Sequence, residues 1–144
     1  MGTTAPIRND AIAEPESLPV DRTTLAMLRV TGARCRVMAR SSDAVEACAL
    51  LHGGRAAETV AQVLLRVFSG EGGMPRLKLY QPGADDVSFD EAWLLSALAA
   101  ADRQDHDSLT FLLARRLPKH ARRPVGRLFV ALAHALDVQD NLAA

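Results

Sequence analysis

The sequence predicts an all-α protein, a compact bundle of about five or six helices with a short extended connector. Hydrophobic residues make up 49% of the 144-residue chain, but aromatic residues only 4%. The core must therefore be built from Ala, Leu and Val, and Ala and Leu are good helix formers. Apolar residues also recur at three- and four-residue spacing in several segments, which is the period of a helix buried on one side.

The chain divides into two parts of different composition. Residues 1–20 carry Pro6, Pro15 and Pro19 among scattered polar groups, and this composition predicts a flexible N-terminal arm. The length of the rest suggests one domain. We therefore expect a single helical domain over residues 21–140.

Three helices are expected in the first half of this domain. Asp21 can cap the first helix, and Gly32 interrupts or ends it. Ser and Asp residues cap a second helix over residues 41–54, which stops at a Gly-Gly pair. A third helix is expected over residues 55–68, because a glycine-rich break follows it at residues 69–73.

A short connector and three further helices complete the predicted bundle. Residues 77–80 alternate in polarity, but one strand cannot form a sheet, so they form a packed connector or pair with a partner. Residues 88–91 form a capping box that opens a helix. Asp105 or Asp107 can cap the next helix, and Pro124 suits the first turn of the last.

Charges gather in blocks although the formal net charge is +0. Residues 22–40 contain five arginines and no acid, whereas residues 85–107 contain seven acids against Arg103 alone. Residues 115–127, here called the arginine turn, again contain no acid. The six cations of the arginine turn are the candidate binding residues: Arg115, Arg116, Lys119, Arg122, Arg123 and Arg127.

The arginine turn has three interpretations. Its cations can be solvated or paired with the acids of residues 85–107, and Arg115 and Arg116 suit the last turn of a helix. A phosphate-like anion could also bind at the helix start near Pro124. In the third interpretation, the blocks 22–40 and 115–127 lie side by side and bind nucleic acid without sequence specificity.

No complete catalytic or cofactor motif is present. Cys48 and His52 lie at i and i+4, and Cys35 adds a third ligand, but no further residue completes a zinc pattern. The glycines at 70–73 lack the Lys and Ser/Thr of a phosphate-binding loop. We therefore expect no enzymatic activity, no metal and no cofactor.

The first residues and the apolar runs indicate a cytoplasmic protein. Residues 1–20 lack the apolar stretch of a secretory signal. No run reaches the roughly 18 apolar residues of a membrane span. We expect a bacterial cytoplasmic location and no membrane association.

Three segments carry a resemblance to other proteins. They are LRVTGA at residues 28–33, LKLYQP at residues 77–82 and DEAWLL at residues 90–95. With these segments, the layout from about Leu25 to Leu136 resembles small uncharacterised helical proteins of alphaproteobacteria. The resemblance implies an α-helical domain of unknown function and no catalytic residue.

The sequence thus predicts a non-enzymatic interaction or regulatory module. The arginine turn (115–127) and the acidic region (85–107) are its expected contact surfaces. A protein partner or self-association is expected. Nucleic-acid or phosphate-anion binding through the basic blocks is the alternative.

Overall fold

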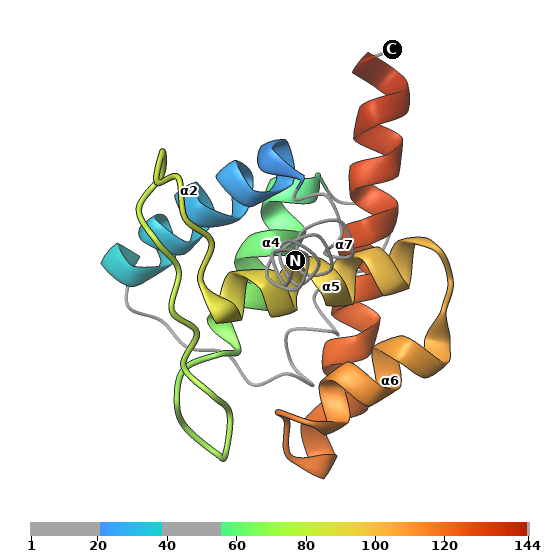
Figure 1. Ribbon diagram of the computed structural model, residues 1–144. Helices are drawn as coiled ribbons and strands as arrows, with labels where there is room; N and C mark the ends of the chain where they lie inside the picture. The colour runs from blue at the N-terminus through green and yellow to red at the C-terminus, as the bar shows by residue number, and fades with distance from the viewer. Residues whose placement is uncertain (1–20, 39–55, 144) are drawn as a thin grey trace, which may run out of the picture.

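The computed structural model describes residues 21–143 except for 39–55, and this part of the chain is helical (Figure 1). Its only β-pairing is an isolated bridge between Ser69 and Arg76, so the predicted all-α class is confirmed. The predicted N-terminal arm and the helix at 41–54 lie outside the described residues. The helices are α2 (Arg22–Met38), α4 (Ala57–Arg66), α5 (Phe89–Asp102), α6 (His106–Ala114) and α7 (Lys119–Ala143).

Helix α7 is the longest and packs against α4, α5 and α6, while α2 packs mainly on α4 (Figure 1). Its Phe129 is fully buried and meets Trp93 of α5 edge to face, with ring centroids 5.8 Å apart. Trp93 also meets Phe68 edge to face at 5.9 Å. These rings join α5 and α7 to the segment that directly follows α4, and small Ala and branched Leu side chains fill most of the rest of the core.

The first described helix does not end at Gly32, as one reading of the sequence expected, but continues to Met38. Gly32 is needed for close packing instead. A Cβ atom at this position would lie 2.5 Å from Cδ1 of Leu79, which is closer than real carbon atoms approach. The glycine therefore lets the extended connector lie against α2.

The last helix begins at Lys119, so the expectation that Pro124 occupies its first turn is wrong. Pro124 lies inside α7, and Pro118 immediately precedes the helix. The buried Ala121 and Val125 are four residues apart, so the apolar face extends one turn further back than expected. This burial offsets the backbone hydrogen bond that Pro124 cannot donate.

Three predicted helix caps are confirmed, and the first is Asp21, whose Oδ1 accepts from the backbone N–H of Thr24 (3.1 Å) at the start of α2. Ser88 Oγ accepts from the backbone N–H of Glu91 (3.0 Å), and Glu91 Oε1 accepts from that of Ser88 (2.9 Å). Asp105 Oδ1 accepts from the backbone N–H of Ser108 (3.1 Å) at the start of α6. Such local contacts need only short sequence separation, which is why the pattern predicted them.

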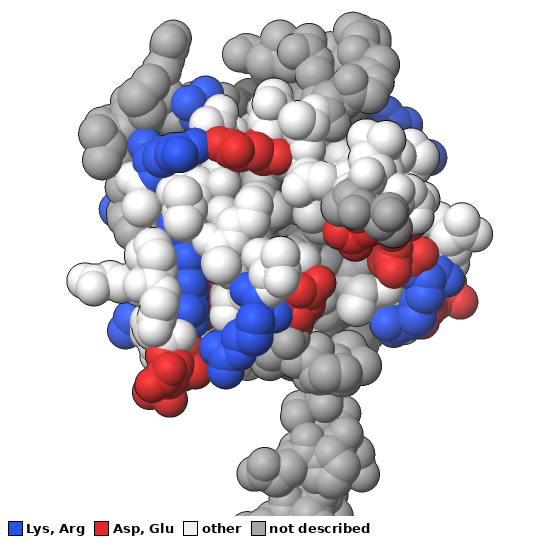
Figure 2. Space-filling view, turned by 90° about the horizontal axis from the view of Figure 1, so that it is seen from above, with Lys and Arg blue, Asp and Glu red and all other residues white. Residues whose placement is uncertain are grey.

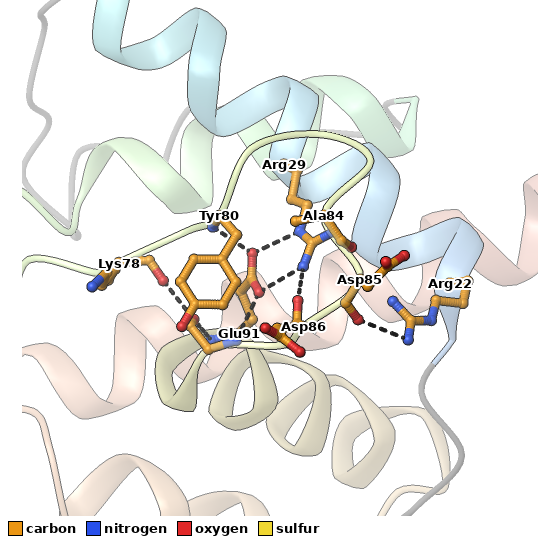
Figure 3. A network of polar contacts seen from close by, with 9 residues as sticks. Arg22, Arg29, Lys78, Tyr80, Ala84, Asp85, Asp86 and Glu91 are labelled. Atoms are coloured by element: carbon orange, nitrogen blue, oxygen red, sulfur yellow. Dashed lines mark hydrogen bonds and ion pairs between the residues drawn. The ribbon is translucent and has the colours of Figure 1, made fainter.

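A buried ion pair joins α2 to α5, and the sequence analysis did not predict it (Figure 3). Arg29 and Glu91 are only 3% and 0% exposed. Arg29 Nε donates to Glu91 Oε2 (2.8 Å) and Arg29 Nη2 to Glu91 Oε1 (3.0 Å). Arg29 also donates to the backbone carbonyls of Ala84 (2.8 Å) and Asp86 (2.6 Å), in the loop between the connector and α5.

Glu91 is equally well partnered. Besides Arg29, it accepts from the backbone N–H groups of Ser88 and Tyr80. Burial acts to raise the pKa of Glu91, but the hydrogen bonds from Arg29, Ser88 and Tyr80 outweigh it and hold the pKa below its ordinary value. Since Glu91 accepts four hydrogen bonds and Arg29 uses four of its five N–H donors within the protein, this buried pair is structural.

We expect Glu91→Gln to lower the free energy of unfolding by about 3–5 kcal/mol, because it leaves the charge of Arg29 buried without a counter-charge. Urea unfolding measures this loss. The matched control is Glu58→Gln, which removes an exposed ion pair with Arg34 and should cost about 0–1 kcal/mol. Similar costs for the two variants would contradict a structural role for the buried pair.

The same pair predicts acid sensitivity. Because the pKa of Glu91 is lowered in the folded state, its contribution is present above the unfolded value of about 4.3 and is lost as the pH falls through the folded value. Wild-type stability should therefore fall more steeply below about pH 4 than that of Glu91→Gln. Urea unfolding at several pH values measures this difference. The expectation would be contradicted if the free energy of unfolding depended on pH equally in wild type and in Glu91→Gln.

Candidate binding groove between α6 and α7

The arginine turn joins the end of α6 to the start of α7, and two of its arginines hold this turn in place. Arg122 Nε donates to the backbone carbonyl of Leu117 (3.0 Å), and its Nη2 donates to that of Ala114 (3.4 Å). The Ala114 carbonyl lies at the C-terminal end of α6, where a helix leaves acceptors without partners, and the Leu117 carbonyl lies in the turn that follows. Arg122, in the first turn of α7, therefore supplies hydrogen-bond donors to backbone carbonyls at and just after the end of α6.

Arg116 is also occupied within the protein. Its Nη1 lies 2.6 Å from Asp90 Oδ1, in an ion pair that is too bent for a hydrogen bond. Its guanidinium lies over the rings of Trp93 (5.1 Å) and Phe89 (5.5 Å). The expected pairing between the arginine turn and the acidic region is therefore real for Arg116, which joins the turn to α5.

The remaining cations divide between open surface and a groove. Arg115 and Lys119 are exposed and do not line the groove, and Arg115 lies over the ring of the exposed Phe111 at 5.5 Å. Arg123 and Arg127 lie on the first turns of α7 and, together with Arg122, line a groove between α6 and α7. The structure thus brings three of the six predicted residues together.

This groove, here called the α6–α7 groove, has a volume of about 610 Å³, an apolar floor and a basic rim. The floor comes from both helices, with Leu109 and Leu113 on α6 and Val130 on α7. None of the described residues that line it is acidic. The complete lining is His106, Leu109, Thr110, Leu113, Arg122, Arg123, Gly126, Arg127, Val130, Ala131 and His134.

Gly126 on α7 and Leu113 on α6 lie close together in the lining of the groove. A Cβ atom at Gly126 would lie 3.3 Å from Cδ1 of Leu113, so the Leu113 side chain would have to shift slightly to accept a larger residue. Without a side chain, this position on α7 accommodates Leu113. The sequence analysis noted the cations of this region but could not place the apolar floor beneath them.

A second groove, with a volume of about 690 Å³, lies between the start of α2, α5 and the C-terminal half of α7. Its lining includes the carboxylates of Asp21, Asp102, Asp137 and Asp140 and no basic residue. Burial and the neighbouring charges of Asp137 and Asp140 raise the pKa of Asp102. The sequence analysis placed Asp102 in the acidic region but missed Asp137 and Asp140.

The remaining titratable groups form no candidate metal site in the part of the chain that the structure describes. There, no three His, Cys, Asp or Glu side chains are placed to hold a metal ion. Cys35 is a half-buried free thiol whose Sγ lies 3.9 Å from the carbonyl of Gln62. Cys48 and His52, which completed the candidate metal set, lie outside the described residues. No helix among residues 21–38 and 56–143 is long and apolar enough to cross a membrane.

Searches against protein families, curated proteins and solved structures found no match to the chain. The resemblance to alphaproteobacterial proteins therefore stays an expectation.

Asp102→Asn should stabilise the protein at neutral pH. A raised pKa means that the ionised form of Asp102 is disfavoured in the folded state, so stability is lost as the pH rises through the folded value. We expect a gain of about 0.2–1 kcal/mol at pH 7, because solvent screens these exposed charges, and no gain at pH 3.

Thermal or urea unfolding at the two pH values measures this gain. Asp107→Asn is the matched control, since Asp107 lies in the first turn of α6, where a negative charge is favourable. That variant should be neutral or slightly destabilised at pH 7. A loss of stability in Asp102→Asn at pH 7 would contradict repulsion within the acidic groove.

Proposed function

We propose that the protein is a non-enzymatic cytoplasmic interaction module whose α6–α7 groove binds an acidic amphipathic helix of a protein partner. The observation that carries the proposal is the combination of an apolar floor with a rim of Arg122, Arg123 and Arg127. A helix that binds in a groove presents apolar residues at three- and four-residue spacing to the floor. Its flanking carboxylates would then lie against the rim.

The rim chemistry favours carboxylates as the charged groups of the ligand. Guanidinium groups bind carboxylates with two parallel hydrogen bonds, which add geometric specificity to charge attraction. Arg123 and Arg127 have no salt bridge within the described part of the protein, so they are available to a partner. His106 and His134 add two further polar groups to the lining of the groove.

The acidic region has fewer carboxylates free to contact a partner than the sequence suggested. Glu91 is paired with Arg29. Asp90 forms an ion pair with Arg116 and accepts a hydrogen bond from the backbone N–H of Lys78 (2.6 Å). Asp105 caps α6. The exposed carboxylates that remain for a partner are those of Asp85, Asp86, Asp102 and Asp107.

Nucleic-acid or phosphate binding is supported less well. Arg29 of the block 22–40 is buried, and the arginine turn lies well apart from α2 in Figure 1. Figure 2 shows the molecule from the side of α2, opposite the arginine turn, and on this face basic and acidic side chains lie in small neighbouring patches rather than in one basic field. The proposed anion site at Pro124 also loses its basis, because α7 starts at Lys119 and its free N–H groups lie there.

We expect Arg123→Glu to weaken binding of an acidic amphipathic probe peptide by about tenfold or more, since it reverses a charge on the rim. The probe is a fluorescein-labelled helix with leucines at helical spacing and glutamates on its other faces. Fluorescence anisotropy measures its affinity. Arg115→Glu is the matched control, because it makes the same charge change in the same turn outside the groove.

A second peptide, with serine in place of every leucine, separates the two parts of the proposed site. It should bind much more weakly, because it has no apolar face for the floor. Equal binding of the two peptides would show that charge attraction alone accounts for the affinity and that the apolar floor contributes nothing. Failure of the leucine peptide to bind at all would overturn the proposed function.

A further inference from the structure

The outer face of α7 carries an exposed apolar ridge that nothing in the described structure covers. Val130, Val138 and Leu142 recur at four-residue multiples and are 41%, 43% and 82% exposed. His134 fills the remaining position of the same row and is also exposed. The ridge begins in the α6–α7 groove, which Val130 and His134 line, and continues along the end of α7 that projects beyond the other helices (Figure 1).

Charge reverses along this helix. All four Lys and Arg residues of α7 lie between Lys119 and Arg127, and both of its acids, Asp137 and Asp140, lie in the second half. Acids near a helix C-terminus interact unfavourably with the helix dipole, and the last turn of α7 contains no base. The projecting end of α7 is therefore itself an acidic helix with an exposed apolar stripe.

We infer that two copies of this chain associate through antiparallel α7 helices, each placing the end of α7 in the α6–α7 groove of the other. This inference rests on the proposed function, because the second copy supplies the acidic amphipathic helix that the groove is proposed to bind. The occupant follows from charge complementarity. An antiparallel arrangement sets the basic half of each α7 against the acidic half of the other.

The residue spacing gives this pairing a register. With the twofold axis between residues 130 and 134, Arg127 of one copy lies opposite Asp137 of the other. In the same register Val138 lies over Gly126, so an exposed apolar side chain meets the part of the groove that Gly126 and Leu113 line. The helix has 25 residues and is about 37 Å long, so both ends can engage at once.

The symmetry of the arrangement favours a closed dimer. Each contact occurs twice, because the same surface serves both copies, and no unpaired copy of it remains to bind a third chain. The pairing would also place Arg127 beside the carboxylates that crowd Asp102. The interface therefore offsets a repulsion that the single chain carries.

Charge reversal tests the inference on the full chain by light scattering coupled to size exclusion. At about 100 µM, a dimer of micromolar affinity would be almost fully formed, and wild type should elute with the mass of two chains. Arg127→Glu and Asp137→Arg should each weaken the dimer by at least about tenfold, because each faces a like charge twice. Mixing the two variants should restore a dimer, since both cross-contacts then join opposite charges.

Controls separate this result from unfolding and from other geometries. Arg115→Glu, outside the groove, should stay dimeric, and both interface variants should keep the helical circular dichroism spectrum of wild type, because their changed side chains are exposed. A wild-type monomer at 100 µM or a mixture that stays monomeric would overturn the inference. A mixture that forms longer assemblies would overturn the twofold arrangement in favour of a head-to-tail one.

The proposed function is tested apart from this result. If wild type is monomeric but still binds the leucine–glutamate peptide through Arg123, the groove binds another protein's helix and only the self-association is wrong. If the chain dimerises but Arg127→Glu and Asp137→Arg leave the dimer intact, the interface lies elsewhere. Both results overturn the antiparallel pairing of α7.

Discussion

The buried ion pair between Arg29 and Glu91 is the constraint on which the arrangement of α2, α5 and the connector depends. Two charges out of water are tolerated only where close pairing and further hydrogen bonds replace their hydration. Here the replacement needs three separate segments, because the carbonyls of Ala84 and Asp86 complete the shell around Arg29. A shift of any one segment would leave a buried charge without partners. We expect the pair to select one packing arrangement more than it adds stability.

The pair also determines which charges are left for binding. It removes one arginine from the first basic block and one carboxylate from the acidic region, and it fixes the start of α5. From that position α5 presents Asp90 and Trp93 to Arg116, so the arginine turn is held against the core on one side. The cations on its other side, along α7, remain exposed beside the apolar floor. The structural pair and the candidate groove are thus linked through α5.

Local features were predictable from the sequence, and features that depend on distant residues were not. The capping box at Ser88 was read directly, because its partners lie three residues apart. The role of Glu91 was read only in part, since its ion-pair partner is 62 positions away in the sequence. Gly32 was misread because an internal glycine required for packing looks the same as one that ends a helix. The true start of α7 was missed because Pro118 and Pro124 are both acceptable near a helix start.

The candidate groove likewise combines a feature that the sequence showed, the block of cations, with one that it could not show, the pairing of some of these cations within the fold. The six cations of the arginine turn were visible in the sequence as a block. Only those cations that have no partner within the protein are free to bind a ligand. Arg116 and Arg122 are used to hold the turn, which leaves Arg123 and Arg127 on the rim. The sequence cannot show which cations are paired, because this depends on which carbonyls and carboxylates lie near them in the fold. What remains is a smaller positive surface placed beside apolar side chains, and that combination is more specific for an amphipathic helix than the full block would be for any polyanion.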